Sequence, residues 1–476
     1  MKFNGFAMFK RHPTGLYLLF TTEMWERFSY YGMRAILSLY MIKALFYSTA
    51  FTSSVYGYYT GLVYLTPLIG GYIADRYWGN RKSIIVGGLL MAMGQFSLAT
   101  SSYFYAPKSV LVTNSFFIFN YQTAFFLIGL FLLVMGNGFF KPNISSMVGF
   151  LYSDNDGKRD SAFTIFYMGI NLGALLSPII VGGLGDTGNP ADFMYGFLAA
   201  GIGMVIGLII FIIGKKNHLV DPEGREVGVV PNHKYDPEYC NNKPLTWVEK
   251  QRIWVIFILA FFGIFFWAAF EQAGVSLTFL AEQHVDRVVT SLNYIIPASW
   301  FQSINPLAIL IFAPLFAALW LKLKDRGKEP SIPLKMAGGL LLLSVGFMIL
   351  VAASKTLDGG ADTISPMWLV GAYIFFTFGE LCISPIGLSM VSKLSPVKFT
   401  CLLMGVWFLT SAAANILAGQ ISTLYPDPSL PTPCILGIPI VGFTSFFMIF
   451  VLMSMIAALV LFIIRKRLET MMHGIK

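Results

Sequence analysis

The sequence predicts an all-α polytopic membrane protein with twelve transmembrane helices, arranged as two six-helix bundles. Composition is the first reason: of 476 residues, 56% are hydrophobic and only 12% are charged, a balance typical of chains that cross a bilayer several times. Segment length is the second reason, because the apolar runs are continuous over roughly 20 residues, the length of a membrane-spanning helix. Strands of a membrane barrel would instead alternate over about ten residues. The third reason is one long polar segment in the middle of the chain.

Twelve candidate spans follow one another along the chain, with the polar segment between the sixth and the seventh. We therefore expect an N-terminal bundle at 1–213, a cytoplasmic linker at 214–250 and a C-terminal bundle at 251–476. The expected spans are about 16–44, 52–75, 82–102, 122–150, 160–183, 193–213, 251–281, 290–322, 334–353, 366–391, 399–424 and 436–465.

A weak internal repeat relates the two halves. The pattern Gly136…Lys141-Pro142…Ser146-Met147-Val148 in span four matches Gly379…Ser384-Pro385…Ser389-Met390-Val391 in span ten at a constant offset of 243 residues. A basic turn also follows span two, at Asp75–Lys82, and span eight, at Lys324–Lys328. Two six-helix repeats with such turns resemble the major facilitator superfamily, which implies pseudo-two-fold symmetry and a central site that faces alternate sides of the membrane.

The distribution of basic residues predicts that both termini are cytoplasmic. With that orientation, 26 of the 33 Lys and Arg residues lie on the cytoplasmic side, as the positive-inside rule requires. The net charge of +9 is then an orientation signal, and no nucleic-acid partner is expected. The first 15 residues lack the apolar region and cleavage site of a signal peptide, so we expect the first span to be retained. The four cysteines have neither metal-ligand spacing nor a disulfide framework.

The first span carries a polar stripe where a membrane helix is normally apolar. Its members recur at i, i+3, i+4, i+7 and i+8, so they share one face of a helix, and charged groups at this depth are by default functional. Glu23 and Arg27 alone would form a self-neutralised pair that only fixes helix packing, and this alternative stays open. The stripe consists of Glu23, Glu26, Arg27, Tyr30, Tyr31 and Arg34.

Three further ionisable residues lie within the spans: Lys141 in the first half, and Glu271 and Glu380 in the second. The bases therefore all belong to the first half. A cavity between the halves would be cationic on one wall and anionic on the other, which suits a zwitterion. We expect its carboxylate to bind Arg34 and Lys141, and its ammonium to bind Glu380 or Glu271.

The same groups predict proton coupling. Four acids face three bases within the membrane, and burial beside other acids favours the protonated carboxyl, so at least one Glu is expected to bind and release a proton. All five histidines fall outside the spans or at their edges, which leaves this role to carboxylates. Static ion pairs of Glu271 and Glu380 with Arg34 and Lys141 remain the alternative.

The motif Glu23-x-x-Glu26-Arg27-Phe28-x-Tyr30-Tyr31-Gly32 resembles the first-helix signature of the proton-dependent oligopeptide transporter family. Further agreement comes from Phe166–Gly173, Gly138–Asn143, Phe301–Pro306 and Gly379–Pro385. The resemblance covers nearly the whole chain. The 37-residue linker is too short for the two extra helices of many bacterial members. The second span reads Val55–Tyr59 where animal members place a proton-linked histidine.

The resemblance implies a proton-coupled symporter of di- and tripeptides that works as a monomer in a plasma membrane, here a bacterial inner membrane, surrounded by lipid. Protons are the expected coupling ion, and no cofactor is expected. Coupling is implied for Glu23, Glu26, Arg27 and Glu271. Peptide binding is implied for Arg34, Tyr30, Tyr31, Tyr64, Lys141, Asn171, Asn305, Glu380, Ser384 and Trp407.

Two alternatives stay open. One is a family relative that carries nitrate or another small organic anion. Such a site would need a basic residue but no carboxylate to bind an ammonium group, and Glu380 argues against it. A membrane-embedded transferase would need paired aspartates, a metal-ligand set or an activated nucleophile, and no span contains one. The chain is therefore not expected to be an enzyme.

Overall fold

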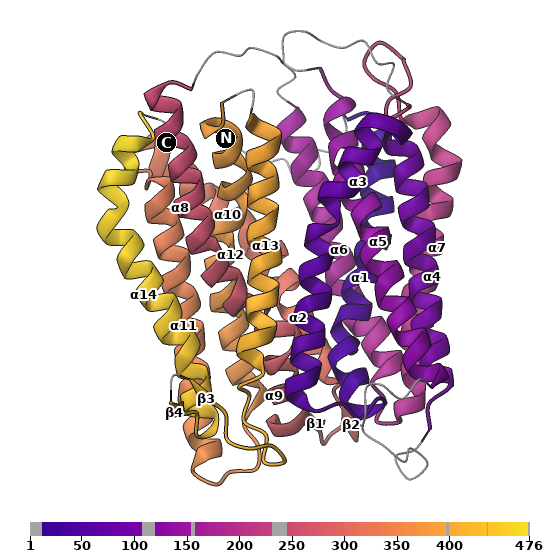
Figure 1. Cartoon of the computed structure of the whole chain (residues 1–476), viewed down its shortest axis with the longest axis vertical. Coiled ribbons are helices and arrows are strands. Elements are labelled where there is room, and N and C mark those ends of the chain that lie inside the picture. Colours follow the sequence, from indigo (N-terminus) through magenta and orange to yellow (C-terminus); the bar gives the residue numbers. More distant parts are fainter. Residues whose placement is uncertain are drawn as a thin grey trace. The chain divides into compact units, whose positions relative to one another are not determined.

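The computed structural model describes residues 12–106, 120–153, 158–230, 245–396, 399–435 and 437–474. Part of the predicted linker at 214–250, and part of the segment between the third and fourth predicted spans, lie outside these residues. Within them, fourteen α-helices occupy the twelve predicted spans (Figure 1). They are α1 (Thr14–Lys43), α2 (Thr49–Leu65), α3 (Pro67–Ile73), α4 (Gly79–Tyr103), α5 (Tyr121–Phe150), α6 (Arg159–Gly185), α7 (Phe193–His218), α8 (Trp247–Phe270), α9 (Ser276–His284), α10 (Ile304–Asp325), α11 (Ile332–Asp358), α12 (Pro366–Leu394), α13 (Thr400–Ser422) and α14 (Gly442–Met471).

Three predicted spans are interrupted. Span two divides into α2 and α3 at Thr66, and Pro67 begins α3, a position where the missing N–H of proline costs no helical bond. Span seven divides into α8, a 3-10 helix at Glu271–Gly274, and α9, because Val275 leaves helical geometry with φ −129° and ψ −93°. The predicted start of span eight is instead a short hairpin followed by a 3-10 helix at Ala298–Ser303. The continuity of the apolar sequence predicted the positions of the spans, but it did not predict the breaks within the helices.

Two hairpins of two-residue strands connect helices in the second half of the chain. In the first hairpin, β1 (Val288–Val289) pairs antiparallel with β2 (Tyr294–Ile295), so that Val288 lies opposite Ile295. In the second hairpin, β3 (Cys434–Ile435) pairs antiparallel with β4 (Ile438–Pro439). These strands are too short to form a layer, and the described structure is otherwise helical.

Contacts divide the chain into two compact units. Unit 1 comprises 1–46 and 65–233, and unit 2 comprises 47–64 and 234–476. In unit 1, α1 packs on α6 and α7, and α4 packs on α5 and α7 (Figure 1). In unit 2, α11 packs on α12 and α14, and α8 packs on α13. The residues of α2 up to Tyr64 belong to unit 2, although they precede most of unit 1 in the sequence. The bundle boundaries at 213 and 251 stay a prediction.

Ten helical stretches in the described residues are long and apolar enough to cross a membrane. One of them, Thr49–Tyr103, covers the second and third predicted spans. Helix α1 is not among the ten. It has sufficient length, but Glu23, Glu26, Arg27 and Arg34 divide its apolar sequence. The polar stripe therefore explains why the composition of α1 differs from that of an ordinary span.

Within unit 2, α2 and α13 approach each other at two glycines. A Cβ added to Gly419 would lie 2.6 Å from both the Cα of Gly57 and the carbonyl oxygen of Ser53. A Cβ added to Gly57 would lie 2.7 Å from the Cα of Gly419. The neighbouring atoms belong to backbone and cannot rotate away, so only glycine permits this helix spacing.

We expect Gly419→Val to destabilise the purified protein, because the added methyl groups must push α13 away from α2. Overpacking of this kind costs typically about 1–3 kcal/mol, and the thermal unfolding midpoint should fall by several degrees. Gly338→Ala on α11 is the matched control, since no atom lies within 4 Å of its added Cβ. An unchanged midpoint in Gly419→Val would contradict the close contact of the two helices.

Candidate substrate and coupling site

Helix α1 buries an ion cluster around Arg27. Nε of Arg27 lies 2.8 Å from Oε1 of Glu23 and 2.7 Å from Oε2 of Glu26, and the three side chains are at most 3% exposed. The spacing of one turn brings all three groups to one face of the helix. Arg27 is thus shared by two carboxylates, and the cluster carries one more negative than positive charge when every group is ionised.

The cluster is incompletely satisfied by its own members. Among the described residues, no hydrogen-bond partner contacts Oε1 of Glu26 or Nη2 of Arg27. Lys141 of α5, also in unit 1, lies close enough to attract the Glu26 carboxylate. Buried polar atoms without partners are uncommon and costly. Binding of a proton or of a charged group to this cluster is therefore expected to change the free energy of the folded protein strongly.

The aromatic members of the stripe surround its guanidinium groups. The guanidinium carbon of Arg27 lies 5.8 Å from the ring centre of Tyr30 and 6.0 Å from that of Tyr31. The guanidinium of Arg34 lies 5.9 Å from Tyr31. All three distances allow cation–π attraction. Arg34 is buried, and its position two turns from Arg27 extends the positive charge along the same face.

Two further predicted residues of unit 1 lie on neighbouring helices. Lys141 is half-buried on α5, directly before the helical Pro142. Asn171 is buried on α6, and its amide donates to the carbonyl oxygen of Tyr167 at 2.9 Å.

In unit 2, Glu380 on α12 is buried and hydrogen-bonded. Nδ2 of Asn305, near the start of α10, donates to Oε2 of Glu380 at 2.8 Å and to the hydroxyl of Thr377 at 3.0 Å. Glu380 and Asn305 were both predicted from the sequence, whereas Thr377 was missed. Thr377 bonds the carbonyl oxygen of Tyr373, so one turn of α12 orients the amide that holds the carboxylate.

Glu271 lies at the break between α8 and α9. It is buried, and its charge acts on that of Glu380 in the same unit. The break itself is held by Gln272, whose Nε2 donates to the carbonyl oxygens of Ala268 and Ala418 at 3.1 Å each. Its Oε1 accepts from Ser276 and Ser422. Gln272 belongs to the motif Phe266-Trp267…Glu271-Gln272, which also agrees with the family signature, but no role was assigned to it from the sequence.

The remaining predicted residues belong to unit 2. Trp407 on α13 is buried against α12, where a Cβ on Gly387 would lie 2.1 Å from its ring. Ser384 is half-buried on α12, one turn from Glu380, and Tyr64 is half-buried near the end of α2. The structure therefore gathers the predicted residues into two sets. Unit 1 holds Glu23, Glu26, Arg27, Tyr30, Tyr31, Arg34, Lys141 and Asn171, and unit 2 holds Tyr64, Glu271, Asn305, Glu380, Ser384 and Trp407.

A family model covers most of this chain. The model of the POT family matches residues 81–227 and 232–434. The chain belongs to the POT family. The resemblance inferred from the first-helix motif is thereby confirmed.

Relatives agree over nearly the full length of this POT-family chain. It is 36% identical to the uncharacterized transporter YclF of Bacillus subtilis, over 87% of this chain and 88% of the relative. It is 31% identical to a di-/tripeptide transporter of Lactococcus lactis, over 98% and 97%. A solved structure of a variant of the peptide transporter POT in complex with alafosfalin superposes with a TM-score of 0.81 at 32% identity, over 98% and 97%. The prediction of an all-α polytopic membrane protein is confirmed, and the chain is a transporter rather than an enzyme.

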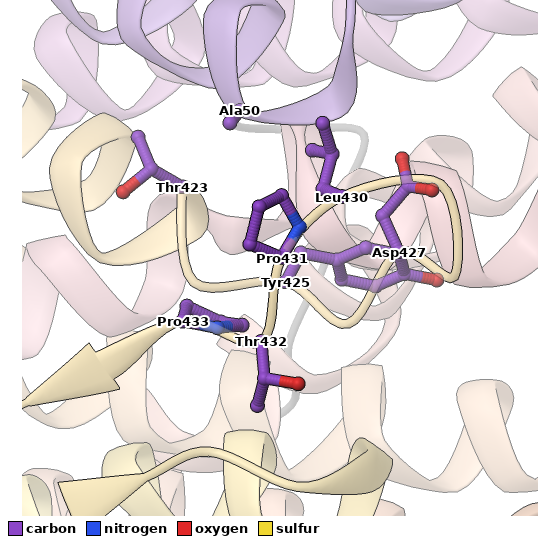
Figure 2. A pocket seen from close by; sticks show the side chains of 8 residues that line it. All are labelled: Ala50, Thr423, Tyr425, Asp427, Leu430, Pro431, Thr432 and Pro433. Carbon is purple, nitrogen blue, oxygen red and sulfur yellow. The ribbon is translucent and has the colours of Figure 1, made fainter.

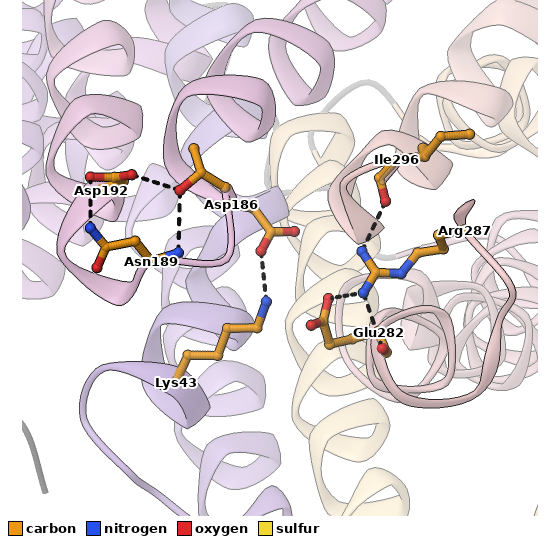
Figure 3. Close-up of polar contacts among 8 residues, drawn as sticks. Lys43, Asp186, Asn189, Asp192, Glu282, Arg287 and Ile296 are labelled. Carbon is orange, nitrogen blue, oxygen red and sulfur yellow. Dashed lines mark hydrogen bonds and ion pairs between the residues drawn. The ribbon is translucent and has the colours of Figure 1, made fainter. Parts of the chain in front are cut away.

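The POT-family chain also has ion pairs at the ends of its helices (Figure 3). In unit 1, Nζ of Lys43 lies 2.7 Å from Oδ1 of the buried Asp186. In unit 2, Arg287 lies 2.9 Å from Glu282 and donates to the carbonyl oxygen of Ile296. These contacts brace helix ends and are separate from the charges within the spans. Among the described residues, no group of His, Cys, Asp and Glu could hold a metal ion.

A cavity of about 340 Å³ lies where the connection after α13 meets the start of α2 in unit 2 (Figure 2). Its polar wall is Asp427, whose carboxylate accepts from the Thr49 hydroxyl and from the backbone and side chain of Ser429. Partial burial alone would raise the pKa of Asp427, but these hydrogen bonds outweigh it and lower the pKa. Asp427 is therefore ionised at neutral pH and gives this cavity a negative edge.

Proposed function

We propose that this POT-family protein is a proton-coupled symporter that imports di- and tripeptides by alternating access. Peptide carboxylates bind Arg34 and Lys141, and the peptide ammonium binds Glu380. Glu23, Glu26, Arg27 and Glu271 couple this binding to proton movement. The named relatives, which include a di-/tripeptide transporter and a peptide transporter bound to alafosfalin, support peptides as the substrate class.

The observation that carries the proposal is the segregation of buried charge. Among the described residues, the buried charged side chains of unit 2 are Glu271 and Glu380, both acidic. In unit 1, the buried Arg81 and Asp186 pair near helix ends with Glu226 and Lys43, and the remaining buried charges are those of the Arg27 cluster and Arg34. The buried bases of the described residues therefore all belong to unit 1, and a substrate with one charge of each sign suits a protein whose bases and further acids are divided in this way.

Proton coupling follows from the surplus of acid. Arg27 is shared by Glu23 and Glu26, and Oε1 of Glu26 has no hydrogen-bond partner among the described residues. Protonation of Glu26 removes the surplus charge and loosens its hold on Arg27. Glu271 lies at the break between two helices, so its protonation changes the charge at a point where the backbone is already discontinuous. Each protonation shifts the equilibrium between the two states of the transporter only if its free energy differs between those states.

The protein is expected in a bacterial inner membrane, as a monomer with both termini in the cytoplasm. The defining assay is uptake of a labelled dipeptide into proteoliposomes under an imposed inward-acid pH gradient. We expect accumulation above the equilibrium level, competition by tripeptides, and its collapse with a protonophore. Uptake that is insensitive to the gradient would refute proton coupling, and uptake of nitrate in place of the peptide would favour the anion-carrier alternative. Glu380 and its amide partner Asn305 weigh against that alternative.

We expect Arg34→Lys to weaken binding of peptides with a free carboxylate by roughly tenfold or more, because lysine cannot make a bidentate contact. Binding measured by competition should be unchanged for a peptide amidated at its carboxyl end. Arg287→Lys is the matched control, since this arginine is paired at a helix end. Equal losses for free and amidated peptides would separate Arg34 from carboxylate recognition.

A further inference from the structure

A concave apolar groove opens on unit 1 where α1, α6 and α7 meet. Its volume is about 330 Å³. Among the residues that line it are Met24, Trp25 and Phe28 of α1, Leu176 of α6, and Ile202 and Ile206 of α7. These α1 residues alternate in sequence with Glu23, Glu26 and Arg27, so the groove occupies the face of α1 that the ion cluster leaves apolar.

Two glycines set the depth of the groove. A Cβ on Gly203 of α7 would lie 2.7 Å from the Phe28 ring, and one on Gly173 of α6 would lie 2.3 Å from the carbonyl oxygen of Met24. Helix α1 therefore sits directly on the backbones of α6 and α7. The larger side chains beside the glycines, Leu176 and Ile202, stand outward and form the rims.

The groove opens outward on membrane-spanning helices. Ile202 is 54% exposed and Leu176 is 39% exposed, and both lie in stretches apolar enough to cross a bilayer. The medium at such a surface is lipid, so an unbranched hydrocarbon chain is the occupant that the lining favours. A hydrophilic substrate would gain no hydrogen bond from this lining.

Charge at the end of α7 identifies the lipid more closely. Ile202, Ile209 and Lys216 are seven residues apart and exposed, so they form one stripe along the helix. Ten residues separate Ile206 from Lys216, which is roughly 15 Å along an α-helix. This equals about half of a hydrocarbon core of roughly 30 Å. Lys215 and Lys216 therefore lie at headgroup level when the groove lies near the middle of the bilayer.

We propose that the groove binds one acyl chain of an anionic phospholipid whose headgroup is held by Lys215 and Lys216. Adjacent lysines at a membrane surface attract anionic lipids, and the groove adds apolar contact. The bound chain packs on Met24, Trp25 and Phe28 and so holds α1 against α6 and α7. The site positions the helix that carries the ion cluster without contacting the cluster itself.

Photolabelling of the purified full-length protein in nanodiscs tests this site directly, and it does not depend on transport. The probe is phosphatidylglycerol with a photoreactive group near the end of one acyl chain, diluted in phosphatidylcholine. We expect labelled peptides to map to 24–28, 176–180 and 199–206. Ala199→Phe, which fills the groove, and Lys215→Ala combined with Lys216→Ala should each lower that labelling at least several-fold. Met93→Phe, at an exposed position on α4, and Lys466→Ala combined with Arg467→Ala on α14 should not.

Labelling spread evenly over the exposed faces of α4, α10 and α14, or unchanged in both groove variants, would overturn the proposal. Equal labelling by a phosphatidylcholine probe would overturn the headgroup assignment to the lysines. Absence of labelling at the groove in a protein that runs as a dimer would show that a second copy rather than lipid covers it. Should Ala199→Phe fail to fold, the smaller Ala199→Leu supplies the same comparison.

Discussion

Glu26→Gln is expected to abolish accumulation of peptide under an inward-acid gradient, while exchange of peptide between the two sides of the membrane persists. Glu26 is fully buried and shares Arg27 with Glu23. Glutamine still accepts a hydrogen bond from Arg27, so the local packing is retained. It cannot gain or lose a proton, however, and the charge of the cluster becomes fixed. The fixed cluster no longer distinguishes the two states of the transporter by protonation.

Two proteoliposome measurements decide the point. One is the ratio of internal to external labelled dipeptide under the gradient, which should fall to about the equilibrium level. The other is counterflow against unlabelled dipeptide without a gradient, which should retain a substantial rate. Glu223→Gln is the matched control, because Glu223 is exposed and paired with Arg225 outside the spans. A Glu26→Gln protein that still concentrates peptide would exclude Glu26 from the coupling mechanism, and loss of both activities would indicate a structural role.

Glu380→Gln is expected to weaken binding of peptides with a free amino terminus by roughly 30-fold or more. Removal of one partner of a buried, hydrogen-bonded charge pair costs about 2–5 kcal/mol, and each 1.4 kcal/mol is a factor of ten in affinity. The glutamine oxygen still accepts from Nδ2 of Asn305, which contacts Oε2 of Glu380 at 2.8 Å in the native chain. The loss is therefore one of charge rather than of local structure.

The diagnostic comparison uses an N-acetylated dipeptide, which has no ammonium group. Its weak competition should be unchanged by Glu380→Gln, whereas the affinity for the free dipeptide should drop to a similar level. Glu329→Gln provides the control, since Glu329 is a partly exposed acid paired with Lys335 in the same unit. Unaltered affinity for the free dipeptide would reassign the ammonium site, with Glu271 as the next carboxylate to test.

Much of the architecture could be predicted because membrane burial acts on each segment locally. A continuous apolar run of roughly 20 residues must form a helix there, whatever its neighbours are. The helix breaks could not be predicted, since they depend on contacts between segments. At Gln272, for example, the amide that stabilises the break donates to Ala418, which is 146 residues away along the chain.

The candidate site shows the same division. The stripe on α1 could be predicted because helical spacing alone places Glu23, Glu26 and Arg27 on one face. The placement of Asn305 against Glu380 could not, because the two residues lie on different helices and are brought together by packing. The family motif suggested both residues, but it did not identify Thr377, whose hydroxyl shares the Asn305 amide.

The sequence by itself determined that this protein is a helical membrane transporter of the POT family, and which charges lie within its spans. Composition, segment length and spacing along one helix are local properties that indicate a helical membrane protein and its charges within the spans, and the resemblance of the motifs indicates the family. Only the tertiary structure decided that Arg27 serves two carboxylates at once, and that α2 packs on α13 through paired glycines. It also decided that the apolar face of α1 lines a groove on α6 and α7. Each of these features depends on distances between particular atoms, and those distances are fixed only when the side chains and helices pack together.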